Sequence, residues 1–251
     1  MEMVLLTAVG VGGATLVGSI IGFFVKNISH KFSDRVLSFA AGVMLSAAVF
    51  GLVMPSLEYG GDNAVYITIL GVFAGALLLN FMDKALPHLH RLSGVDIEEH
   101  SEKSGQINKI ILFVMAIAIH NLPEGIAAGV GFGTGNVGEA MAIAGGIALQ
   151  NIPEGMVIIA PMLAAGFGKG KTFLAAIMTG AIEVVGTLLG YFAVSLSSAI
   201  LPFALAFAGG TMLYVISDEM IPETHHNGDR FVTYALLMGF SLMLIIDFYL
   251  G

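Results

Sequence analysis

Eight stretches of this chain are apolar and long enough to cross a lipid bilayer as helices. A hydrocarbon core of about 30 Å takes roughly 20 helical residues, and lipid offers no water to an unpaired backbone. We therefore predict an all-α integral membrane protein with one transmembrane domain over residues 1–251. The predicted spans are residues 4–25, 36–57, 64–86, 107–131, 138–164, 172–194, 199–221 and 232–250.

The composition supports this prediction and limits the chemistry. Charged residues make up 11% of the chain, against about 25% in an ordinary soluble domain. The first span follows Glu2 rather than a basic segment, so we interpret it as a membrane helix and not as a targeting peptide. The chain has no cysteine, so a metal site here uses imidazole, carboxylate, amide or thioether ligands.

The basic residues predict the orientation. All 10 lysines and arginines lie between spans one and two, three and four, five and six, or seven and eight. By the positive-inside rule these connections face the cytoplasm. Both termini then lie outside it, in a multi-pass protein of the plasma or inner membrane. The one long polar connection, residues 88–106, is predicted to be a cytoplasmic loop.

Two related motifs lie in the central spans: HNLPEG at residues 120–125 and QNIPEG at residues 150–155. In each motif a nitrogen or oxygen ligand stands four residues before a glutamate, so both side chains share one helix face. Asn121 and Asn151 point about a quarter-turn away and can reach an adjacent ion. The motifs lie on consecutive antiparallel spans, which indicates an inverted pseudo-repeat of three, two and three helices.

Each motif also has a proline inside a predicted helix, Pro123 and Pro153. Proline frees a carbonyl one turn back and is expected to kink the helix. In a membrane such a position is tolerated where neighbouring helices or a polar cavity satisfy the freed group. Proline beside an ionisable residue therefore indicates a site.

Three glutamates fall near the centres of neighbouring spans: Glu124, Glu154 and Glu183. Ionisable groups are costly at that depth and usually functional. Three carboxylates together need protons or cations between them. The alternative to a metal site is that the three glutamates are protonated and hydrogen-bond the helices to one another. Likewise, His120 could be a packing residue and not a ligand.

Further candidate ligands lie outside the two motifs, most of them near the ends of the spans. On the outer side, Glu58 and Asp247 could form an acidic entrance or be ordinary interfacial acids. Met44 in span two offers a thioether, although packing is the usual role of methionine. On the inner side, a group of acids and histidines has two interpretations: transient ligands along a release path, or an ordinary solvated loop. The residues are Asp83, His88, His90, Asp218, Glu219, Glu223 and His225.

Several functional classes have no motif in this chain. It contains no Walker A loop for ATP and no HExxH zinc-protease motif. Its few basic residues lie in loops, which argues against nucleic acid as a partner. We therefore predict a protein that is not an enzyme and that uses neither ATP nor nucleic acid.

These motifs resemble the ZIP (Zrt/Irt-like) family of divalent metal transporters, in particular its GufA-like prokaryotic branch. The likeness rests on HNLPEG, on SFAAGVMLSAAVFGLVMPSLE in span two and on GGTMLYVISDEMIPETHH in span seven. It extends over essentially all eight spans.

The resemblance implies a binuclear site with entrance and exit residues. It places His120, Glu124, Gln150 and Glu154 at a first ion, with Met44 as a further ligand, and Asn121, Asn151 and Glu183 at a second, bridged by Glu124 and Glu154. It places Glu58 and Asp247 at the entrance, and Asp83, His88, His90, Glu219, Glu223 and His225 along the exit. Asn151 departs from the aspartate that relatives often carry, and an amide in place of a carboxylate weakens the second position or changes its ion preference. Asp218 stands where a relative can carry a histidine, which puts the exit role of Asp218 in doubt.

The resemblance predicts a secondary transporter that moves Zn²⁺, or Cd²⁺, Fe²⁺ or Mn²⁺, toward the cytoplasm by alternating access. The expected partners are then divalent ions, the lipid bilayer and a second copy of the chain, since homodimers are common in the family. Two alternatives stay open: a metal-gated channel or sensor, and an intramembrane metalloenzyme in which two bridged metals activate water.

Overall fold

The computed structural model describes residues 1–24, 30–85, 102–164, 166–226 and 228–251, and within these ranges the chain is helical without β-strands. The helices that form the fold are α1 (Glu2–Phe24), α2 (His30–Ser46), η1 (Ala47–Val53), α3 (Met54–Tyr59), α4 (Ala64–Ala85), α5 (Glu102–Gly131), α6 (Val137–Ala164), α7 (Lys169–Leu196), α8 (Leu201–Val215), η6 (Ile216–Met220), α9 (Ile221–His225) and α10 (Phe231–Leu250). Short 3₁₀ turns join several of them.

These helices form eight rods, because α2, η1 and α3 are continuous, as are α8, η6 and α9. Seven of the described rods are long and apolar enough to cross a membrane, and α5 is the eighth long helix. The chain is therefore a multi-pass helical membrane protein. The eight predicted spans coincide with the rods. Of the predicted loop 88–106, residues 88–101 lie outside the described residues, and 102–106 are the first turns of α5.

The irregular backbone lies in different places from the two motif prolines. Pro123 and Pro153 lie inside α5 and α6, which run through them as α-helices. Two rods instead contain π-helical segments, η1 and η6. Each π-segment is followed by a short helix with a proline in its first turn, Pro55 in α3 and Pro222 in α9. Sequence reasoning did not predict these segments.

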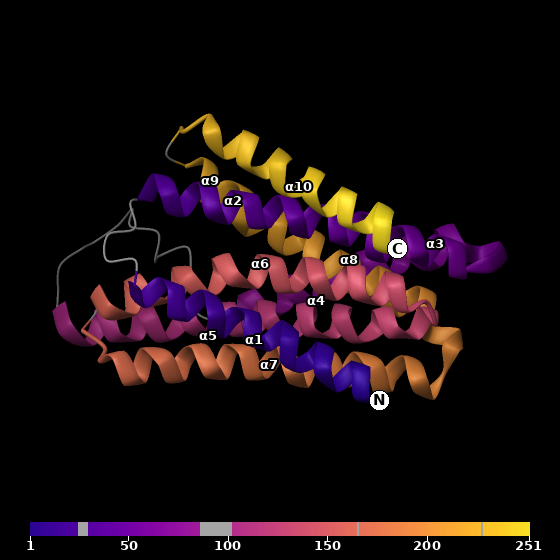
Figure 1. Cartoon of the computed structure of the whole chain (residues 1–251), viewed down its shortest axis with the longest axis horizontal. Helices are drawn as coiled ribbons and strands as arrows, with labels where there is room; N and C mark the ends of the chain where they lie inside the picture. The colour runs from indigo at the N-terminus through magenta and orange to yellow at the C-terminus, as the bar shows by residue number, and fades with distance from the viewer. Residues whose placement is uncertain (25–29, 86–101, 165, 227) are drawn as a thin grey trace.

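The rods pack in two groups. Helices α1, α5, α6 and α7 pack mainly against one another, and the rods of α2, α4, α8 and α10 form the second group. Figure 1 shows the rods running along the long axis of the molecule, with both termini at the same end. Since the rods alternate in direction, the basic helix ends lie at the opposite end from the termini: Lys31, Arg35, Lys84, Lys169, Lys171 and Arg230.

Glycines bring the helices of each group into backbone contact. A methyl group on Gly42 of α2 would collide with the carbonyl oxygen of Leu236 on α10, and one on Gly75 of α4 with that of Phe207 on α8. Small residues allow this approach, and van der Waals contact then stabilises the pair, since lipid gives helices no hydrophobic reason to associate.

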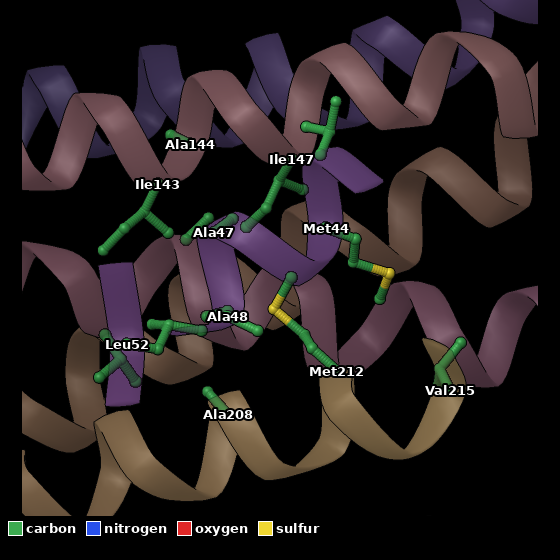
Figure 2. Close-up of a cluster of buried hydrophobic side chains, with 14 of the residues drawn as sticks. Met44, Ala47, Ala48, Leu52, Ile143, Ala144, Ile147, Ala208, Met212 and Val215 are labelled. Carbon is green, nitrogen blue, oxygen red and sulfur yellow. The ribbon is translucent and has the colours of Figure 1, made fainter. Parts of the chain in front are cut away.

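The contact between the two groups is apolar at its centre. Figure 2 shows Met44, Ala47, Ala48 and Leu52 of α2 and η1 between two other helices. Ile143, Ala144 and Ile147 of α6 lie on one side, and Ala208, Met212 and Val215 of α8 on the other. Because α6 belongs to the first group and α2 and α8 to the second, this small-residue surface is the plane where the groups meet.

A charged contact ties α2 to α10 at the basic end. Nη2 of Arg35 lies 2.8 Å from Oδ2 of Asp229, and its guanidinium stands 4.8 Å from the Phe231 ring centroid. The backbone N–H of Phe231 and then Arg35 donate to Asp229, which lowers the pKa of that carboxyl. The pair is at the surface, so we expect it to contribute little to stability.

Gly42→Ala tests the glycine packing. The added methyl group has no room beside Leu236, so α2 and α10 must separate at a cost of about 1–3 kcal/mol. We expect a lower melting temperature in detergent, followed by the loss of monodisperse protein on heating. The control is Gly10→Ala on α1, where a methyl group meets nothing within 4 Å. Equal melting temperatures for the two variants would contradict the packing argument.

Candidate metal centre

The two motifs bury their polar side chains at one level between α5 and α6. Asn121 and Glu124 of α5 are 1% exposed, and Gln150 and Asn151 of α6 are fully buried. The glycine that ends each motif explains this position. Gly125 lies against the backbone of Glu183 on α7, and Gly155 against that of Thr15 on α1, so neighbouring helices close over both motifs.

Glu183 accepts hydrogen bonds from both motif amides. Nδ2 of Asn121 donates to its Oε1, and Nδ2 of Asn151 donates to its Oε2 at 2.6 Å. Asn151 also reaches the carbonyl oxygen of Val11 at 3.3 Å. Three side chains far apart in the sequence, Asn121, Asn151 and Glu183, are thus brought together.

Several buried polar atoms beside this cluster make no hydrogen bond. They are both carboxylate oxygens of Glu124, both polar side-chain atoms of Gln150, and Oδ1 of Asn121 and of Asn151. A buried polar atom without a partner costs about 1–3 kcal/mol, more if charged. Such a concentration of oxygen acceptors suits a cation, whose ligands are lone pairs.

The remaining motif ligands lie nearer the contact between the two groups. Nε2 of His120 is 2.9 Å from Oε1 of Glu219 on η6, and the two side chains are 12% and 33% exposed. Glu154 is half-buried. His120 and Glu219 were predicted for the metal site and the exit respectively, and their contact joins the two regions.

No three histidine, cysteine, aspartate or glutamate side chains lie close enough to share one metal ion, within the part of the chain that the structure describes. Binding at this site would then depend on amide oxygens as well as carboxylates. Met44 is 1% exposed in the apolar cluster between the groups, which also contains Met212.

The outer acids lie near an acid that sequence reasoning missed. Glu58 is exposed on α3, and Asp247 is half-buried on α10 within electrostatic range of Glu139 on α6. The hydroxyl of Tyr59, beside Glu58, lies 3.5 Å from Oε2 of Glu139. Glu139 lies in the first turn of α6, where an acid is common, so its position in the sequence gives no signal.

Only part of the predicted exit is described. His88, His90 and the side chain of Asp83 lie outside the described residues. Asp218 and Glu223 are exposed on η6 and α9. His225 places Nδ1 2.9 Å from the carbonyl oxygen of Ile221 and Nε2 3.3 Å from the Thr233 hydroxyl.

Two hydroxyl residues were also missed. The hydroxyl of Thr15 donates to Oε1 of Glu183 at 2.7 Å, and Ser46 has a buried hydroxyl without a hydrogen-bond partner. Serine and threonine are ordinary in membrane helices, where they bond their own backbone. Their types therefore gave no signal.

Comparison with known proteins identifies the family. The family model described as ZIP Zinc transporter matches residues 93–247. The chain belongs to the ZIP zinc transporter family. It is 38% identical to the zinc transporter GufA of Myxococcus xanthus, with 96% of both chains covered. It is 36% identical to the zinc transporter ZIPB of Bordetella bronchiseptica, covering 95% of this chain and 78% of the relative.

A third ZIP relative is similar over a comparable range. The zinc transporter ZupT of Chlorobaculum parvum is 35% identical, with 94% of this chain and 92% of the relative covered. The family and branch suggested by HNLPEG are thereby confirmed. The ligand positions implied by the family resemblance stay predictions.

Glu124→Leu tests whether the buried carboxylate is kept at a cost to stability. Leucine replaces an unsatisfied polar group with an apolar one, which is often neutral or stabilising in a core. In excess chelator we expect the variant to melt about 2–4 °C higher than wild type. Added Zn²⁺ should raise the wild-type melting temperature and leave the variant's unchanged. A variant that melts lower in chelator would mean that Glu124 supports the fold.

Proposed function

We propose that this ZIP protein is a secondary transporter that carries Zn²⁺ across the membrane through a site between α5, α6 and α7. The observation that carries the proposal is the concentration of unpartnered buried oxygens on Glu124, Asn121 and Asn151 beside a second carboxylate, Glu183. The names of the relatives, all zinc transporters, give the ion. Cd²⁺, Fe²⁺ and Mn²⁺ have similar ligand preferences and are proposed as further substrates.

The proposed site has two ion positions. The first is lined by His120, Glu124, Gln150 and Glu154, with Met44 as a further candidate. The second is lined by Asn121, Asn151 and Glu183, with Glu124 and Glu154 between the two. Gln150, Asn151 and Glu124 are buried, which supports a site in which side chains replace the water molecules around the ion. The amide at Asn151 supplies no charge, so the second position is expected to be the weaker.

An inverted pseudo-repeat would place this site on its axis. Helices α1 to α4 would correspond to α7 to α10, with α5 corresponding to α6. In support, Gly12 of α1 and Gly180 of α7 lie against each other. Six residues further along each helix, Gly18 lies against Ile152 and Gly186 against Leu122. Leu122 and Ile152 hold the same place in the two motifs.

The second group gives matching support. Residues 39–45 read FAAGVML and residues 207–213 read FAGGTML. Gly42 lies against Leu236 of α10, and Gly210, 168 positions later, lies against Val72 of α4. The π-segments η1 and η6 occupy corresponding places in these two rods.

Alternating access would come from movement of the first group against the second. The surface around Ala47, Ala144 and Ile147 is formed by apolar side chains, which have no hydrogen-bonding groups to separate as they slide. The contact of His120 with Glu219 crosses between the groups and would change with the movement. No nucleotide motif is present, so the ion gradient and membrane potential are the proposed drive. Inward transfer of a dication is favourable by about 4.6 kcal/mol per 100 mV, twice the single-charge value.

The proposed direction is toward the cytoplasm. The basic helix ends would face inward and both termini outward. Glu58 and Asp247 would then concentrate cations at the outer end, and Asp83, His88, His90, Asp218, Glu219, Glu223 and His225 would lie toward the inner end. We propose a single transmembrane domain that works without ATP or nucleic acid, either alone or as a homodimer.

Two other functions remain to be separated by experiment. A metal-gated channel or sensor would bind zinc but would give uptake that does not saturate. An intramembrane metalloenzyme would use the paired ion positions to activate water and would show hydrolysis in place of transport. The family resemblance favours transport without catalysis.

Uptake of ⁶⁵Zn into proteoliposomes at fixed potential tests the transporter. We expect saturable wild-type uptake, and a fall of at least about 10- to 100-fold in Glu154→Ala, because loss of a residue that only supports a metal ligand already costs that much. Glu183→Ala should lose less, as a residue of the weaker position. Asp62→Ala, which removes an exposed acid outside the site, is the matched control. Zinc binding by wild type without any uptake would sink the transporter proposal.

Single cysteines test the orientation, because the chain has none of its own. Asp62 and Gly170 are exposed at opposite ends of the bundle. In intact cells a membrane-impermeant maleimide should label Asp62→Cys and spare Gly170→Cys until the membrane is opened. The reverse pattern would place the basic helix ends outside.

A further inference from the structure

The side chain of Thr15 on α1 makes a contact that no motif accounts for. Its hydroxyl donates to Oε1 of Glu183 at 2.7 Å, and the residue is 1% exposed. Glu183 therefore accepts from three helices: Thr15 on α1, Asn121 on α5 and Asn151 on α6. A carboxylate has about four acceptor sites, so three of them are filled by neutral donors.

The packing of α1 fixes where the Thr15 hydroxyl can point. The carbonyl oxygen of Thr15 lies against Gly155, which leaves no space between α1 and α6. One turn on, the hydroxyl of Ser19 donates to that carbonyl at 2.9 Å and to the carbonyl of Gly155 at 3.1 Å. As a β-branched residue, threonine has few side-chain conformations in a helix. The hydroxyl is thus held toward Glu183.

Thr15 and Glu183 also hold corresponding places in the proposed repeat. The carbonyl of Thr15 lies against the last glycine of the second motif, and that of Glu183 against the last glycine of the first. Each carbonyl accepts from a hydroxyl four residues later at 2.9 Å, Ser19 in one case and Thr187 in the other. The first half thus supplies a hydroxyl donor where the second supplies a carboxylate acceptor.

The contact has a consequence for the motif amides. The two Glu183 oxygens accept from these amides, so Asn121 and Asn151 turn their NH₂ groups toward Glu183. Their Oδ1 atoms then face away from it, and both are buried without a hydrogen-bond partner. Anything that fixes the Glu183 carboxylate therefore fixes the direction of two oxygen ligands.

We propose that Thr15 is a positioning residue for the transported ion: with Glu183 it orients the amide oxygens of Asn121 and Asn151 toward the second ion position. Partners of this kind, one step behind the ligands, fix ligand orientation in metal sites. Glu183 then contributes to the second position through the amides as well as by lining it. The inference rests on the proposed function, whose second ion position it defines more closely.

Zinc binding by the purified full-length protein in detergent, measured by equilibrium dialysis with ⁶⁵Zn, tests this role. Thr15→Val keeps the shape of the side chain and removes the hydrogen-bond donor. We expect the ion in the second position to bind about tenfold more weakly, which corresponds to the free energy of one hydrogen bond to a charged group. Thr15→Ser restores the donor and should bind within about twofold of wild type. Thr7→Val makes the same change two turns earlier on α1, where the hydroxyl contacts Met141 and no carboxylate; it should not alter binding.

A double-mutant cycle shows whether Thr15 acts through Glu183. In Glu183→Ala, the further change Thr15→Val should have no effect on zinc binding, because the orienting carboxylate is already gone. Unchanged binding in Thr15→Val, failure of Thr15→Ser to restore it, or an additive loss in the double variant would each overturn the inference.

The same cycle measured by thermal unfolding in chelator involves no zinc. There, Thr15→Val should lower the melting temperature in wild type and not in Glu183→Ala, and equal shifts would overturn the pairing of the two residues. Failure of wild type to bind or transport zinc would instead overturn the proposed function. The two failures are therefore distinguishable.

Discussion

Burial of charge away from water is the constraint on which this structure depends. A carboxylate in a helical membrane protein needs donors or a cation within reach, since neither lipid nor apolar side chains can replace its hydration. Glu183 accepts hydrogen bonds from three helices, whereas, among the described residues, neither carboxylate oxygen of Glu124 makes one, and the donor beside it is the amide of Gln150. The two residues show the two solutions side by side. One carboxylate is held by the protein, and the other is left for something the protein must bind.

The glycines decide which residues can meet at that depth. Gly125 and Gly155 end the two motifs, and each admits the backbone of a neighbouring helix. Without this approach, Asn121 and Asn151 could not both reach one carboxylate on α7. The small residues that pack the helices are therefore also what assembles the polar cluster, because side chains as short as asparagine span only a few ångströms. Packing and binding depend here on the same positions.

The sequence predicted what depends on hydropathy and short spacing. Eight apolar stretches predicted the eight rods, and HNLPEG pointed to the family, whose resemblance implied that Asn121, Asn151 and Glu183 lie together. It could not predict that His120 would meet Glu219, because that contact joins α5 to a rod about 100 positions away and depends on how the two groups pack. Thr15 was missed for a similar reason: a threonine on a membrane helix has no distinctive pattern until its neighbour is known. The π-segments were missed because the residues of η1 and η6 show no pattern that separates a π-turn from an α-turn.

The π-segments give two of the rods a freedom that a regular α-helix lacks. A π-turn holds more residues than an α-turn, so it can pass along the rod by exchanging backbone hydrogen bonds one at a time. Each residue so transferred moves by about 1.5 Å along the axis and turns about the axis by the usual helical step. In η6 the residues on that turn include Glu219, the partner of His120. Such a shift of η6 would change which side chain the rod presents to α5 and would leave the rod helical throughout.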